Sequence, residues 1–214
     1  MSTSSGRDRP RRPAHFSLAA MEALGASTPG PAEQTEVAHA SAEAVVGIGR
    51  AARDPEVTAR LVALVDELGL DTIAALWAAR PAGSLPGALW RLYALREWVL
   101  RSPQAASREY AAGMRLAETS HVIAGAAEPP GPAELSALVD AILTGVYAGE
   151  LDVALSRAGA FCRIISAGRA QLAHDTDRTD GERGRAETES AASMLATAAD
   201  LEAAAYRWRQ GTLT

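Results

Sequence analysis

Apolar residues recur along most of the chain at the three- and four-residue spacing of a helix that buries one face. In residues 55–68 the large apolar side chains follow the pattern i, i+4, i+7, i+8 and i+11. A cleaner stripe covers residues 135–146, and residues 194–208 carry another. Alternation of apolar and polar positions, which is typical of strands, never extends beyond a few residues. The pattern therefore predicts an all-α protein.

Capping residues and prolines divide this pattern into seven or eight helices, which we expect to pack as a compact bundle or orthogonal array. Asp54-Pro55 and Ser102-Pro103 each place a capping side chain before a proline at the first helical position. Gly69 suits the end of a helix. The predicted helices cover about residues 31–53, 55–68, 71–80, 86–101, 103–127, 133–148, 152–173 and 188–210. The fifth of them extends through Met114 and could reach Ala127, and Gly113 or Gly125 could break it.

The chain is predicted to consist of a disordered arm, residues 1–31, and one helical domain, residues 32–210. Residues 174–187 are charged and contain glycine, so we expect an exposed connection before the last helix. Four arginines near residue 10 make the arm basic, which suits either a solvated tail or an arm for nucleic acid or an acidic partner. Phe16, Leu18 and Met21 could instead form a short helix that docks on the domain.

The chain contains no lysine and no asparagine, and all 21 basic residues are arginine. Both missing residues have AT-rich codons, so a high-GC genome is the simplest explanation. The absence of lysine excludes Schiff-base chemistry, a phosphate-binding loop with its lysine, and a protein kinase fold.

Charge and cysteine content narrow the class of protein further. A net charge of −5 argues against a nucleic-acid partner, because such domains normally carry a basic surplus. The single cysteine, Cys162, allows neither an intramolecular disulfide nor a cysteine-based zinc site, and its apolar neighbours predict a buried position. No apolar run reaches the roughly 18 residues of a membrane span, and no secretory signal follows the N-terminal arginines. We therefore expect a cytoplasmic protein.

One predicted helix, residues 89–100, is apolar nearly all round and should be central in the fold. Arg96 falls within its apolar sector, where a buried guanidinium needs a carboxylate partner or an anionic ligand. Three interpretations remain open: an internal ion pair, a ligand or partner site, and a guanidinium that reaches solvent. The internal partners would be Asp66, Asp140 or Glu109. The candidate binding residues are Trp90, Arg91, Tyr93, Arg96 and Trp98.

The sequence contains no recognisable catalytic motif. The four histidines lack the spacing of metal ligands, and Ser120-His121 lacks the sharp elbow and small neighbours of a hydrolase nucleophile. Gly-rich nucleotide signatures are also missing. We therefore assign no catalytic, cofactor-binding or metal-binding residue.

Three stretches resemble a known group of proteins. They are residues 84–98, with Ser-Leu-Pro-Gly-Ala-Leu-Trp-Arg-Leu-Tyr, residues 121–132, and the segment that ends at Cys162. These stretches are similar to a group of uncharacterised all-helical proteins from high-GC actinobacteria, which are often labelled as RNA polymerase β subunit. Taken literally, that label requires a much longer chain with lysine-bearing segments. The resemblance therefore implies a helical fold and a partner connected with transcription, with RNA polymerase as a candidate.

These observations favour a non-enzymatic interaction or accessory protein that binds a protein partner. The alternative is a sensor for an anionic metabolite, with its site at the helix that carries Trp90 and Trp98. That alternative predicts a pocket of a few hundred Å³ lined by Trp, Tyr and Leu. A helical enzyme would instead require carboxylates or a histidine that converge in a cleft with shifted pKa values.

Overall fold

The computed structural model describes residues 30–52, 54–118, 130–177 and 180–214. These residues form nine helices and no strand, which confirms the predicted all-α class. The predicted N-terminal arm lies outside the described residues, apart from exposed Gly30 and Pro31, where the first described helix begins. The helices are α2 (Pro31–Ala52), α3 (Pro55–Val62), α4 (Leu64–Leu68), α5 (Leu70–Trp77), α6 (Leu85–Arg101), α7 (Pro103–Glu118), α8 (Pro132–Tyr147), α9 (Leu151–Asp177) and α10 (Gly181–Arg209).

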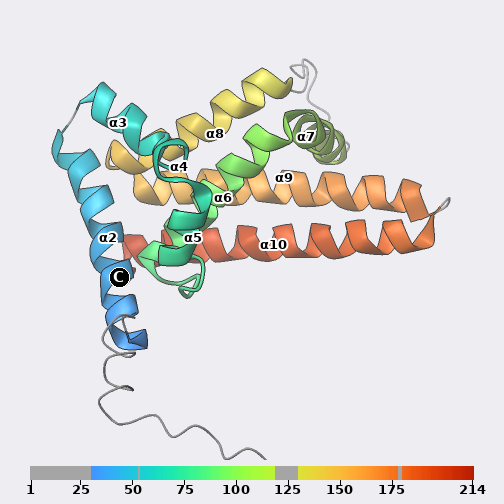
Figure 1. Ribbon diagram of the computed structural model, residues 1–214. Coiled ribbons are helices and arrows are strands. Elements are labelled where there is room, and N and C mark those ends of the chain that lie inside the picture. Colours follow the sequence, from blue (N-terminus) through green and yellow to red (C-terminus); the bar gives the residue numbers. More distant parts are fainter. Residues whose placement is uncertain (1–29, 53, 119–129, 178–179) are drawn as a thin grey trace, which may run out of the picture.

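Two long antiparallel helices, α9 and α10, form one side of the molecule, and the other helices gather around them (Figure 1). α2 stands across one end of this pair, and α7 packs against α9. Small residues allow the pair to approach closely, because Ala158, Cys162, Ala198 and Ala205 are all fully buried.

α6 is the central helix, as its nearly continuous apolar sequence predicts. It contacts α2, α5, α7, α8, α9 and α10. Ten of its 17 residues are buried, among them Leu89, Tyr93 and Val99. A side chain on α6 therefore meets another helix in most directions, and polar groups on this helix need partners from its neighbours.

The predicted second helix, residues 55–68, is interrupted at Ala63. The amide of Ala63 donates to the carbonyl oxygens of Ala59 and Leu61, and α4 starts anew at the next residue. The break allows Asp66 to contact Arg96 of α6, while Leu68 remains 49% exposed. The apolar stripe alone could not show this, because a continuous helix would have placed Leu68 on the buried face.

Helix extends over most of residues 174–187, where we expected an exposed connection. α9 continues to Asp177, and α10 begins at Gly181 with Asp180 as its N-cap. The carboxylate of Asp180 accepts a hydrogen bond from the amide of Arg183 at 3.2 Å. Arg183 also pairs with Glu187 one turn later, at 3.1 Å. Local charge pairs of this kind favour helix in a polar stretch. Most of these residues are nevertheless exposed.

The backbones of α7 and α9 cross at two glycines. A Cβ on Gly168 would overlap the carbonyl oxygen of Glu109, and a Cβ on Gly113 would overlap the carbonyl oxygen of Ile164. Neither position has room for any side chain, so this crossing depends on glycine in both helices. The sequence predicts that the helix which begins at Pro103 could extend to Ala127. α7 ends at Glu118, and residues 119–129 are outside the described residues.

The residues after α10 return to the start of α6. Leu213 is 6% exposed, and the amide of Leu85 donates to the main-chain oxygen of Thr214 at 2.8 Å. α10 therefore has defined contacts along its length, because it lies along α9 and the residues after it reach the first residue of α6.

Candidate functional site

The first turn of α6 is held by the loop that precedes it. The hydroxyl of Ser84 accepts from the amide of Gly87 at 3.3 Å and donates to the carbonyl of Pro81 at 2.7 Å. Gly87 lies against the Pro81 carbonyl so closely that a side chain there would overlap it. This cap fixes the position of the helix that carries all five predicted binding residues.

Arg96 is buried and paired inside the protein. Its side chain is 8% exposed, and Nε donates to Oδ1 of Asp140 on α8 at 2.7 Å. Nη1 lies 3.3 Å from Oδ2 of Asp66 on α4. Of the three interpretations that the sequence left open, the structure shows the internal ion pair. Glu109, the third possible partner, pairs with Arg169 instead.

Tyr93 faces the core and not a ligand space. It is fully buried, and its hydroxyl donates to the carbonyl of Leu61 at 2.5 Å. The hydroxyl of Tyr147 forms a second, short hydrogen bond with that of Tyr93. Since the Tyr93 hydroxyl donates its hydrogen to the Leu61 carbonyl, the Tyr147 hydroxyl is the donor in this pair. Burial raises the pKa of Tyr93 to about 12.

Arg91 lies on the outer side of α6 and binds Asp200 of α10. Nη2 and Nε lie 2.9 Å and 3.1 Å from the same carboxylate oxygen. Nη1 donates to the carbonyl of Gly87, one turn earlier, at 3.0 Å. The Arg91 side chain is only 23% exposed, so its charge is neutralised by a partner within the fold.

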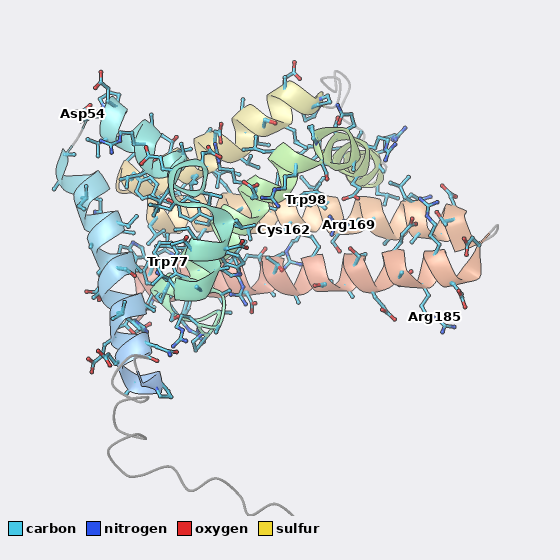
Figure 2. All side chains as sticks on the ribbon, viewed as in Figure 1. Asp54, Trp77, Trp98, Cys162, Arg169 and Arg185 are labelled. Carbon is cyan, nitrogen blue, oxygen red and sulfur yellow. The ribbon has the colours of Figure 1, made fainter. Side chains whose placement is uncertain are left out.

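Trp98 contacts a third arginine that is paired within the fold, Arg169. The guanidinium of Arg169 lies 4.7 Å from the ring centroid of Trp98, within the range of a cation–π contact. Nε of Arg169 donates to Glu109 at 2.7 Å, and Nη1 donates to Ser190 at 3.1 Å. Figure 2 shows Trp98 and Arg169 near each other beside the α9–α10 pair. One face of Trp98 is therefore occupied by an arginine of the same chain.

A hollow of about 290 Å³ lies between α6, α10 and the end of α5. We call it the tryptophan hollow. It brings together three of the predicted residues, Trp90, Arg91 and Trp98, but neither Tyr93 nor Arg96. Its volume agrees with the pocket of a few hundred Å³ expected for a ligand site, although tyrosine is not part of the lining. The lining residues are Ala78, Trp90, Arg91, Ala94, Leu95, Trp98, Met194 and Thr197.

The sequence analysis did not predict that α10 forms one wall of the tryptophan hollow. Met194 was assigned to the apolar stripe of the last helix, and Thr197 was not singled out at all. Both are half-buried in the structure. The stripe showed that this helix packs against the others, but not which helix it meets. The Arg91–Asp200 pair is one of the contacts between α6 and α10, and its partners are 109 residues apart in the chain.

Two other concavities have a more polar lining. One, of about 540 Å³ between α7, α9 and α10, contains Arg108 together with the pairs Arg169–Glu109 and Arg183–Glu187. The other, of about 1070 Å³, lies where α2, α3 and α8 meet. Among the described residues, its charged lining residues are Arg50 and Asp54, and Asp54 is used as the N-cap of α3. Its described lining residues do not form a set of groups that suits one ligand.

The single thiol is buried. Cys162 is 0% exposed, as predicted, and burial raises its pKa to about 12. Among the described residues, no group of three or more His, Cys, Asp or Glu side chains is arranged to hold a metal ion. Within the same residues, no helix is both long enough and apolar enough to cross a membrane.

Comparisons with known proteins give no relative. No protein-family model, no curated protein and no solved structure matches the chain. The resemblance to the actinobacterial group therefore remains a prediction from the sequence.

Proposed function

We propose that this is a protein-binding domain, and that the tryptophan hollow receives apolar side chains of a partner protein. The observation that carries the proposal is the makeup of the hollow. Two tryptophans, a leucine and a methionine form an apolar wall around a space of about 290 Å³. Trp90 and Trp98 are half-buried, so part of each ring remains accessible at the surface.

The residue types in the hollow are those that dominate binding energy at protein interfaces. Tryptophan and arginine are enriched among residues whose truncation costs most, and methionine is enriched at interfaces. Arg91 is held in place by Asp200 and Gly87 before any partner arrives. A preorganised side chain loses less conformational entropy on binding.

The pairing of both arginines favours a protein partner over an anionic metabolite. Arg91 is neutralised by Asp200, and Arg96 by Asp66 and Asp140. An anion that approached Arg91 would compete with a carboxylate already at 2.9 Å. Apolar side chains of a partner can bind in the hollow without displacing the Asp200 carboxylate from Arg91. The resemblance to proteins labelled as RNA polymerase β subunit makes RNA polymerase the first partner to look for.

The test is capture of partners from a lysate of the protein's own host with the full-length chain as bait. Blocked baits carry Ala94→Gln or Thr197→Gln, which place longer side chains in the hollow without removing a buried group. The matched control is Thr188→Gln, also on α10. The hydroxyls of Thr188 and Thr197 each donate to the carbonyl four residues earlier, but Thr188 lies outside the hollow.

We expect one stoichiometric partner that is captured by the unmodified and Thr188→Gln baits and lost with both blocked baits. The capture should persist at higher salt, because apolar contacts are screened little. Equal capture by blocked and unblocked baits would place the interface elsewhere, and absence of any specific partner would count against a docking function. Circular dichroism of each bait verifies that the variants are folded.

A further inference from the structure

The first 29 residues contain one cluster of large apolar side chains. Apart from Met1, their only large apolar side chains are Phe16, Leu18, Met21 and Leu24, which fall within nine residues. Aromatic and aliphatic side chains are the groups that a hollow walled by tryptophan, leucine and methionine accepts. We infer that residues 16–24 of this chain occupy the tryptophan hollow and compete there with the partner protein. This inference rests on the proposed function of the hollow.

The position at which the segment joins the domain brings it close to the hollow. Thr35, in the second turn of α2, accepts a hydrogen bond from Nη1 of Arg80 at 2.7 Å. Ala78, two residues before Arg80, forms part of the lining of the hollow. The start of α2 is therefore beside the edge of the hollow that α5 contributes. Five residues separate Leu24 from Gly30, and the six Cα–Cα steps between them span about 20 Å when extended.

A second contact ties the middle of α2 to α5. Nε1 of Trp77 donates to the hydroxyl of Ser41 at 3.0 Å. Together with the Arg80–Thr35 bond, it holds α2, the helix that residues 1–29 precede, against α5 and the residues just after it. A short tether of this kind gives the segment an effective concentration on the order of 1 mM at the hollow. Even a weak contact is populated at that concentration.

The charges of the two parts are complementary. Arg7, Arg9, Arg11 and Arg12, against Asp8 and Glu22, give residues 1–29 a net charge of +2. The chain as a whole carries −5, so residues 30–214 carry −7. Opposite net charges favour association of the segment with the domain to which it is attached.

A fluorescent label on the segment tests its location in the full-length chain. Ser17→Cys provides a thiol between Phe16 and Leu18 for a bimane dye, which tryptophan quenches on contact. The native thiol does not compete for the label, because Cys162 is 0% exposed. With the segment in place, the dye lies against Trp90 or Trp98. We expect at least two-fold lower emission than in the same labelled chain with Ala94→Gln or Thr197→Gln. Thr188→Gln should leave the emission low.

The quenching should not depend on protein concentration, because the contact is within one chain. It should also be lost when Phe16→Ala and Leu18→Ala are combined. Equal emission from blocked and unblocked chains would overturn the inference. Quenching that increases with concentration would overturn it as well, since the occupant would then be a segment of a second copy.

Failure of this inference is distinguishable from failure of the proposed function. If the dye is unquenched while the hollow-blocking baits still lose their partner, the hollow binds a partner but residues 16–24 do not occupy it. If the hollow-blocking substitutions relieve the quenching but no partner is captured, residues 16–24 occupy the hollow. The proposed function as a partner-docking site is then excluded. If both hold, the combined Phe16→Ala and Leu18→Ala chain should bind the partner severalfold more tightly.

Discussion

A Cβ on Gly168 of α9 would lie 2.9 Å from the amide nitrogen of Gly113 and would overlap the carbonyl oxygen of Glu109 on α7. Gly168→Ala therefore forces α7 and α9 apart. We expect this variant to lose about 1–3 kcal/mol of unfolding free energy, the usual cost of overpacking. The separation should also weaken the Arg169–Glu109 pair beside it. Chemical denaturation monitored by circular dichroism measures the loss.

The matched control is Gly47→Ala, also within a helix. Gly47 is exposed, and a Cβ there would meet nothing within 4 Å. Alanine loses less backbone entropy on folding, so this variant should gain about 0.5–1 kcal/mol. If both variants were stabilised alike, the backbones of α7 and α9 could not be as close as the structure places them.

The two carboxylates that bind Arg96 should contribute unequally. Asp140 is 2.7 Å from Nε, whereas Asp66 is 3.3 Å from Nη1 and more exposed. Asp140→Asn should cost about 1.5–3 kcal/mol, in the range of hydrogen bonds to charged groups. Asp66→Asn should cost less than about 1 kcal/mol, as for exposed ion pairs. Urea unfolding of the two variants decides the order, and a larger loss for Asp66→Asn would contradict it.

Stability should fall at alkaline pH because of Tyr93 and Tyr147. Burial raises the pKa of Tyr93 from 10.0 to about 12 and raises that of Tyr147 as well. The folded state therefore holds these protons more tightly than the unfolded state. Their contribution is complete below about pH 10 and is lost as the pH rises through about 12, in total roughly 2 kcal/mol or more.

Urea unfolding at a series of pH values between 9 and 12 tests this. The chain contains no lysine, so no amine side chain titrates in the same range. Cys162, whose pKa is also raised, contributes a loss of the same sign. The combined variant Tyr93→Phe and Tyr147→Phe removes the tyrosine contribution and should show a flatter profile. An identical profile for this variant and the unmodified chain would exclude the tyrosine pair as the cause.

Cys162 should react with thiol reagents only when the protein opens. It is fully buried, and its pKa of about 12 leaves little thiolate at neutral pH. We expect labelling at pH 7.5 to be slow in buffer and to accelerate with denaturant in parallel with unfolding. Stoichiometric labelling within minutes in buffer would show that α9 and α10 separate locally without global unfolding.

The sequence was sufficient to predict the fold class and the centre of the fold. Helical periodicity and caps such as Asp54 are local signals, and the carboxylate of Asp54 does accept the amide hydrogen of Glu56 at 2.8 Å. The apolar helix with Trp90 and Trp98 proved central for the same reason: a helix without a polar face must be surrounded. Burial of Arg96 implied a carboxylate partner, and Asp66 and Asp140 were among those expected.

The structure brings only three of the five candidate residues to one hollow, because periodicity does not give the rotation of a helix relative to its neighbours. Tyr93 and Arg96 face α3, α4 and α8, whereas Arg91 and Trp98 face α10 and α9. The two pairs of residues can be told apart only from contacts between segments that are distant in the sequence. The break at Ala63 is similar, since it follows from the packing of α4 and not from a turn residue.

The central position of α6 has a consequence for synthesis of the chain on the ribosome. α6 ends at Arg101, but α8, α9 and α10, which cover much of it, follow later in the sequence. The apolar surface of α6 therefore emerges well before the residues that bury it. Nascent chains that stop before α8 leave the apolar face around Arg96, whose partner Asp140 lies on α8, uncovered unless a chaperone binds it. Completion of the last helix is the step that closes the core.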